Sequence, residues 1–178
     1  MKQCLIVVFL IMLFLPGVFP QSLVEQRKAR NGVIDLRGAE FRGGAFSLNG
    51  EWKFYPDQLL EPDQVSGNNA RNTEFPKLWT KEAGPRNPGN GTATYALTIL
   101  LSPDHPKLAF ELPESYCSNN LYANNSLISW NGVPATTRNK SIPFWETKTI
   151  NAPPGDTIKL VLQLANFWHS KGGCLKIS

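Results

Sequence analysis

A period-two alternation of apolar and polar residues most constrains the fold of this chain. It is clearest near the C-terminus, at Ile158, Leu160, Leu162 and Leu164, with Asn166 next on the same face. This spacing puts the apolar side chains on one face of a β-strand. Because such a face must be buried, the chain has to form packed sheets.

Shorter segments of the same kind precede this stripe, and no helical period longer than one turn interrupts them. Fourteen Pro and fourteen Gly are spread between them, which suits turns. We predict further strands over 33–36, 51–55, 93–101, 108–112, 117–123, 127–130 and 144–150. The predicted fold class is therefore all-β: an antiparallel β-sandwich of jelly-roll type.

Three local predictions refine this fold in the first half of the chain. Asn49-Gly50 is the strongest hairpin signal and leads into the strand at 51–55. Asp57 to Leu60 is predicted as one helical turn capped by Asp57. Residues 61–93 are polar and broken by prolines, so we predict a long loop there, of a length that is often functional.

The N-terminus has the pattern of an export signal. Lys2 precedes an unbroken apolar run from Cys4 to Leu15, which Pro16 ends. The run is shorter than the roughly 20 residues that span a membrane. We predict a signal peptide at 1–22, a polar lead-in at 23–31, and one domain at 32–178 that is exported to the periplasm or cell surface. An uncleaved N-terminal membrane anchor is the alternative.

Charge and cysteines add weak constraints. The net charge of +4 comes from scattered basic residues, with one cluster at 27–30. A solvated lead-in explains that cluster better than a nucleic-acid or lipid patch does. Cys117 and Cys174 follow the signal, so export would allow a disulfide between them, with two buried thiols as the alternative.

Catalytic motifs are absent from the sequence. It holds no nucleophile elbow, phosphate loop or zinc-protease motif, and His105 lies in a turn-forming stretch. We therefore predict a protein that is not an enzyme and needs no metal or cofactor.

The five tryptophans are more informative. Trp52 lies inside a strand and is predicted to be a core residue. Trp79 is predicted either to cap the sandwich or to face solvent, and Trp130, Trp145 and Trp168 lie near strand ends, where loops form a rim. Exposed rings on such a rim can stack against sugars, although plugging the core is an equally common role.

Several motifs follow one another in a set order: 33–37, 48–55, Phe75-Pro76 with Trp79, 93–95, and 165–169 with Gly172-Gly173. Together they resemble the extracellular sensor domains of bacterial seven-transmembrane receptors with diverse intracellular signalling modules. The sugar-binding sandwich of some β-galactosidases shares the Asn49-Gly50-Glu51-Trp52 and Thr94-Tyr95 features more loosely. Two features depart from the family: Asn124-Asn125-Ser126 stands where an Asn-Gly hairpin is common, and no seven-helix region follows.

The resemblance implies a galactose-binding-like, extracytoplasmic domain that binds a small, carbohydrate-like ligand and reports it to a membrane receptor or to the rest of the same receptor. The candidate ligand-binding residues are Trp79, Tyr95, Trp145, Asn166 and His169. In this hypothesis the aromatic rings stack while Asn166 and His169 form hydrogen bonds. Asn166 has a second predicted role, bonding the backbone of the loop that follows it. Two other functions remain open: a protein-interaction module, and an accessory sugar-binding domain of a glycosidase.

Overall fold

The structure, a computed structural model, describes residues 27–41, 45–65, 69–79, 89–170, 172 and 177–178. The predicted signal peptide at 1–22 and Cys174 lie outside these residues. Within them, no helix is long and apolar enough to cross a membrane.

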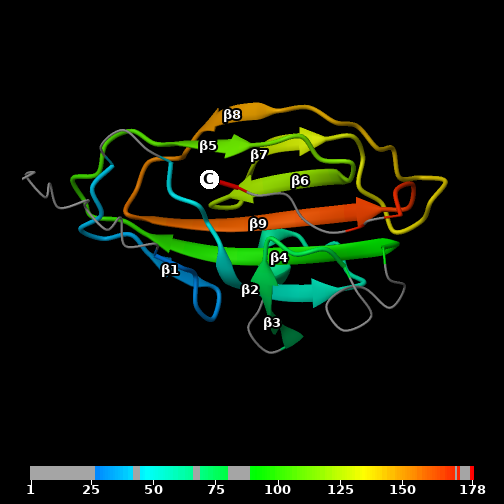
Figure 1. The fold of residues 1–178 in the computed structure, drawn as a ribbon, viewed down its shortest axis with the longest axis horizontal. Helices are drawn as coiled ribbons and strands as arrows, with labels where there is room; N and C mark the ends of the chain where they lie inside the picture. Colours follow the sequence, from blue (N-terminus) through cyan, green and yellow to red (C-terminus); the bar gives the residue numbers. More distant parts are fainter. Residues whose placement is uncertain (1–26, 42–44, 66–68, 80–88, 171, 173–176) are drawn as a thin grey trace, which may run out of the picture.

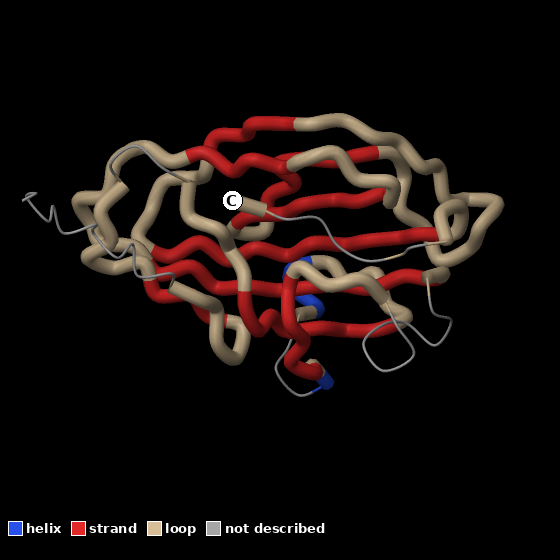
Figure 2. Tube along the Cα trace, viewed as in Figure 1, coloured by secondary structure: helices blue, strands red, loops and turns tan. Residues whose placement is uncertain are grey.

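Nine strands make up almost all of the regular structure, and the prediction of an all-β antiparallel sandwich is confirmed (Figures 1 and 2). The 3-10 turn η1 (Pro62–Gln64) accompanies them. The strands are β1 (Val33–Asp35), β2 (Gly50–Pro56), β3 (Arg71–Phe75), β4 (Gly91–Leu100), β5 (Ala109–Leu112), β6 (Ser118–Ala123), β7 (Ser126–Asn131), β8 (Lys148–Asn151) and β9 (Thr157–Asn166).

Seven strands form one large sheet. Its order is β3-β2-β4-β9-β6-β7, and β1 pairs with β4 in parallel, as an exception to the antiparallel pattern. β4 and β9 form the long central pair of this sheet (Figure 1). Their register sets Tyr95 opposite Leu162 and Leu97 opposite Leu160. The two apolar stripes read from the sequence therefore lie side by side and form the floor of the core.

A smaller layer covers this floor. β5 and β8 pair with each other, and Phe110 and Leu112 of β5 belong to the same buried cluster as the stripes of β4 and β9. Ile177 and Ser178 extend the layer, because the Leu48 N–H donates to the Ile177 carbonyl and the Glu111 N–H to the Ser178 carbonyl. Trp52 is fully buried between the layers, as predicted, and its Nε1–H donates to the Leu48 carbonyl at 2.8 Å.

The outer face of the large sheet is partly covered by the segment that contains η1. Thr94 Oγ1 accepts from the Leu60 N–H at 2.9 Å, and Gln163 Nε2 donates to the Leu60 carbonyl at 3.0 Å. Both side chains are buried and polar, so these bonds satisfy them and fix the segment to the sheet.

Three local predictions were wrong. Asn49-Gly50 is not a hairpin, because the neighbours of β2 are β3 and β4. β3 lies inside the predicted long loop. The helical turn lies at 62–64, beyond the predicted 57–60, because Asp57 has a φ of 59° and cannot start a helix.

Two predicted boundaries also shift. The last strand before β9 runs from 148 to 151 instead of 144 to 150. Residues 27–31 of the predicted lead-in pack on the domain: Ala29 is buried, its N–H donates to the Asn49 carbonyl, and its carbonyl accepts from the Glu51 N–H.

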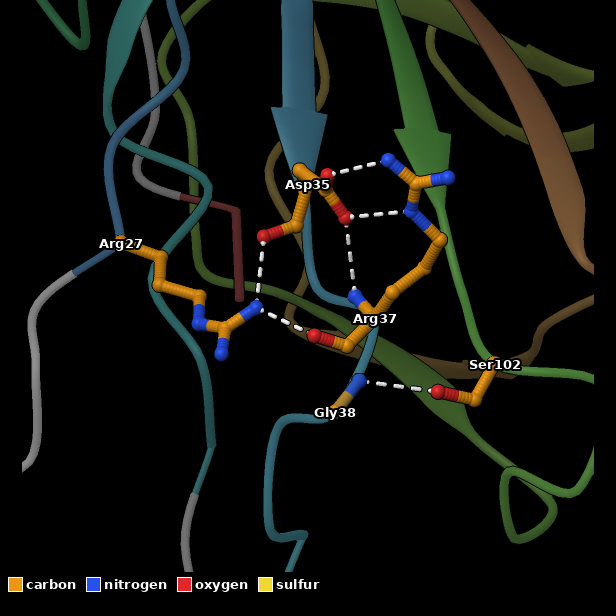
Figure 3. A network of polar contacts seen from close by, with 5 residues as sticks. All are labelled: Arg27, Asp35, Arg37, Gly38 and Ser102. Atoms are coloured by element: carbon orange, nitrogen blue, oxygen red, sulfur yellow. Dashed lines mark hydrogen bonds and ion pairs between the residues drawn. The ribbon is translucent and has the colours of Figure 1, made fainter.

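A polar network joins this packed segment to β1 (Figure 3). Arg37 donates to the Asp35 carboxylate from Nε at 2.9 Å and from Nη2 at 2.6 Å, and Arg27 Nη1 donates to the carbonyls of Asp35 and Arg37. Hydrogen bonds from the Arg37 side chain and backbone lower the pKa of Asp35 from 3.8 to about 2.

This network predicts an acid titration with a defined sign. The folded state favours the Asp35 carboxylate, so its contribution to stability is present above pH 3.8 and is lost as the pH falls towards 2. We expect Arg37→Gln to return the Asp35 pKa towards 3.8, as measured by NMR of the side-chain carboxyl carbon. Arg27→Gln is the control and should change the midpoint less, because Arg27 contacts only carbonyls. An unchanged midpoint in Arg37→Gln would contradict the assignment.

Candidate ligand-binding site

A group of aromatic side chains gathers at one end of the sandwich. The first residue of β6 pairs with the end of β9, at Ser118 and Ala165, and the last residue of β7 pairs with Asn119. The segment before β6, the loop after β7 and the loop after β9 therefore meet at this end. Each of these segments carries exposed or half-buried rings: Tyr116, Trp145, Trp168 and His169. We call this group of four residues the aromatic end.

The rings contact one another in an open arrangement. Tyr116 and His169 stack with centroids 4.7 Å apart and an angle of 10° between their planes. Tyr116 also lies 6.4 Å from Trp145, at a tilted angle of 56°. Tyr116 and Trp145 are each 57% exposed, so these rings offer surface to solvent instead of filling the core.

Trp168 lies in the same loop as His169 and is tied to the loop after β7. Its Nε1–H donates to the Ser141 carbonyl at 3.2 Å, and the Arg138 guanidinium lies 4.5 Å from its ring centroid. Asn131 Nδ2 anchors the same loop by donating to the Phe144 carbonyl at 2.7 Å. The aromatic end thus combines ring faces with one cationic hydrogen-bond donor, Arg138.

Asn166 holds the loop after β9 in place. It is buried, and its Nδ2 donates to the carbonyls of Gly89 and His169, the latter at 2.7 Å. Its Oδ1 accepts from the backbone N–H groups of Trp168 at 3.4 Å and His169 at 3.1 Å. Of the two roles predicted for Asn166, the structure has the backbone-bonding one. Asn166 is a positioning residue beneath the aromatic end.

Trp79 and Tyr95, two predicted stacking residues, lie inside the domain. They are 5% and 2% exposed, and Trp79 Nε1 donates to the Tyr95 hydroxyl at 2.8 Å. Since both rings belong to the main core, neither offers a face for a sugar. Of the two roles predicted for Trp79, the structure has the one in which it closes the end of the core.

Gly172 explains how the chain passes over Trp79. The Trp79 N–H donates to the Gly172 carbonyl at 2.8 Å, and a Cβ at position 172 would come within 2.6 Å of Trp79 Cε3 and of the Gly89 carbonyl oxygen. The glycine is needed for this close approach.

The structure brings together only part of the predicted site. Trp145 and His169 lie at the aromatic end, and Asn166 supports it. Tyr116 and Arg138 were missed by the sequence analysis. Tyr116 could have been found from its position directly before the predicted strand at 117–123, where a loop forms part of the rim. Cys117 is buried, and the predicted disulfide involves Cys174, which lies outside the described residues.

The described residues contain no group of three or more His, Cys, Asp or Glu side chains that could hold a metal ion.

Comparison with known proteins gives a likeness of fold. No protein-family model and no curated protein matches the sequence. Among solved structures, a β-glucuronidase from an uncultured Clostridium species matches with a TM-score of 0.54 and 11% identity, over 74% of this chain and 28% of that one. β-Glucuronidases from Faecalibacterium prausnitzii and Ruminococcus gnavus match with TM-scores of 0.49 and 0.48, at 14% and 16% identity.

The clostridial match supports a likeness of fold alone. It covers 28% of that β-glucuronidase, and the other two matches each cover 67% of this chain and 20% of theirs. The fold of this chain is a β-sandwich that is similar to part of the clostridial β-glucuronidase.

Proposed function

We propose that this domain binds a carbohydrate-like ligand at the aromatic end. The observation that carries the proposal is the exposed ring cluster of Tyr116, Trp145 and His169, placed at a loop-bearing end of the sandwich. The apolar face of a sugar ring packs on aromatic rings, while its hydroxyls need neighbouring donors and acceptors. Arg138 and the His169 ring supply such groups.

The fold likeness favours one biological setting for this binding. An accessory sugar-binding domain of a glycosidase would have the fold observed here and would correspond to a small part of a longer enzyme. The proposal assigns binding, and not catalysis, to this domain.

A second setting rests on the sequence resemblance. The order of motifs from 33–37 to 165–169 is similar to that of extracytoplasmic receptor sensor domains, in which an exported sandwich reports its ligand to a membrane receptor. Both settings use the same ligand site. The gene sequence on either side of this region distinguishes them: a catalytic domain supports the first, and seven apolar spans support the second.

Truncation of Trp145 tests the site directly. We expect Trp145→Ala to weaken binding of the best-bound sugar by at least about tenfold, because a central exposed ring in a binding site contributes more than about 1.4 kcal/mol. The measurement is isothermal titration calorimetry with a panel of monosaccharides and β-linked disaccharides.

Trp130→Ala is the matched control. Trp130 is 60% exposed, similar to Trp145, but lies on β7 and has Lys148 5.3 Å from its ring centroid, outside the cluster. We expect its replacement to leave sugar affinity unchanged. Equal losses in the two variants, or no sugar binding by the unmodified chain at millimolar concentration, would reject the proposed site.

A further inference from the structure

The outer face of the large sheet carries a hollow that is separate from the aromatic end. Its volume is about 440 Å³, within the range of small-molecule sites. The hollow spans three neighbouring strands and is lined by Lys53 and Tyr55 of β2, Ala96 and Thr98 of β4, and Lys159 and Val161 of β9.

The hollow exists because the cover of this face stops part of the way along the sheet. The segment 57–65 is bonded over Thr94 and Gln163, while Pro62 and Val65 form one wall of the hollow. Beyond that wall, the floor is small and apolar, because Ala96 and Val161 lie opposite each other in the β4–β9 register. The turn at Asn31 and Gly32 limits the hollow on another side.

The charged side chains that line the hollow are both basic. They are Lys53 and Lys159, and among the described residues no Asp or Glu lines it. Lys53 Nζ donates to Asn31 Oδ1 at 3.3 Å, and within the described part of the chain neither lysine forms an ion pair with a carboxylate. Acidic side chains occur towards the rim: the Glu51 carboxylate accepts from the Asn31 N–H at 3.2 Å, and Glu61 and Asp63 flank the wall residue Pro62 in sequence. Two ammonium groups beside a hollow with an apolar floor favour an anion that also has an apolar face.

The register fixes the distance that such a ligand must span. Lys53 lies opposite Ala96, and Lys159 lies opposite Thr98, so the lysines stand on the two strands that flank β4. Two strand spacings, about 10 Å, separate these strands, and the two-residue offset between Ala96 and Thr98 adds about 7 Å along them, so the two Cα atoms lie about 12 Å apart. One sugar-sized ring fits between the lysines above Ala96.

We propose that this hollow binds a small, hydroxylated anion of the size of a sugar acid or sugar phosphate, with Lys53 and Lys159 as its charge partners and Ala96 and Val161 as its floor. Thr98 and Asn31 offer hydrogen bonds to the hydroxyls. This site is independent of the aromatic end, and it requires a negative charge on the ligand.

Binding to the full chain at low ionic strength tests the proposal, with NMR chemical shifts as the readout and three probes: glucuronate, glucose 6-phosphate and glucose. We expect one or both anions to shift the amide signals of β4 and β9 near Ala96 and Lys159, and glucose to leave them unchanged. Stronger binding of glucuronate would identify a carboxylate ligand, and stronger binding of glucose 6-phosphate a phosphate ligand. Raised salt should weaken binding.

Substitutions in the hollow test which of its side chains bind the anion. Lys159→Gln and Lys53→Gln should each weaken anion binding by about fivefold, the effect of losing one exposed ion pair. Ala96→Leu should abolish anion binding, because the larger side chain would occupy the space above the floor of the hollow while both lysines remain. Lys107→Gln, at an exposed lysine outside the hollow, and Trp145→Ala should leave anion binding unchanged. Equal binding of glucose, no binding of either anion at millimolar concentration, or full affinity in both lysine variants would overturn the proposal.

Discussion

Gly50→Ala is expected to lower the free energy of unfolding by about 3 kcal/mol or more, because the new side chain would be strained by the backbone conformation and would overlap a neighbouring segment. Gly50 has a φ of 122°, which side chains other than that of glycine rarely adopt. An added Cβ would also overlap the backbone carbonyl oxygen of Ala29, whose segment pairs in parallel with Gly50. Urea unfolding of the full chain measures the loss.

Two further variants show whether close approach or turn geometry sets this cost. Gly38 has a φ of 67° and open space around its Cβ position, so Gly38→Ala should cost only about 1 kcal/mol. Gly50→Asn should be as harmful as Gly50→Ala, whereas a hairpin glycine would tolerate Asn well. A small loss in Gly50→Asn would contradict the packing explanation.

The misread hairpin illustrates a limit of sequence patterns. Asn-Gly is a local signal, but the residue that requires glycine at position 50 is Ala29, and only the folded chain brings the two together. The tight hairpin lies instead between β6 and β7, where Asn124 and Asn125 have φ values of 47° and 69°. Asparagine tolerates this region, so the turn forms without glycine.

The strands that fill the core were predictable, because the alternation of apolar and polar residues can be read from a few neighbouring positions in the sequence. The stripe at 158–164 and the alternation from 93 to 101 both became central strands with matching buried faces. β3 was missed because it is an edge strand and mostly exposed, so its sequence, Arg71–Phe75, carries no apolar alternation. Its pairing with β2 depends on backbone bonds that composition does not reveal.

The site was harder to predict, because burial of an aromatic ring depends on what covers it. Trp79 and Trp145 have similar surroundings in the sequence, since each follows a phenylalanine and a proline closely. One is closed over by the segment at Gly172, and the other stays open beside Tyr116. Asn166 was readable as a loop-bonding residue because it continues an inward apolar face, where an amide must find partners.

Asn166→Ala is expected to lower the free energy of unfolding by about 3 kcal/mol, because buried groups that lose their hydrogen-bond partner cost about 1–3 kcal/mol each. The carbonyls of Gly89 and His169 would lose a donor, and the backbone N–H groups of Trp168 and His169 would lose an acceptor. Urea unfolding measures the stability. If the aromatic end binds sugar, affinity should fall as well, since the loop that carries His169 loses its support.

Asn120→Ala separates this effect from the general cost of removing an amide. Asn120 lies on β6, and its Nδ2 donates to Gln163 Oε1 at 3.0 Å in a half-buried position, so its loss should cost about 1 kcal/mol. It does not contact the loop after β9, and sugar affinity should stay unchanged. Equal losses of stability in the two variants would mean that Asn166 contributes only one ordinary hydrogen bond. A large stability loss with unchanged sugar affinity would place the ligand away from the loop that Asn166 holds.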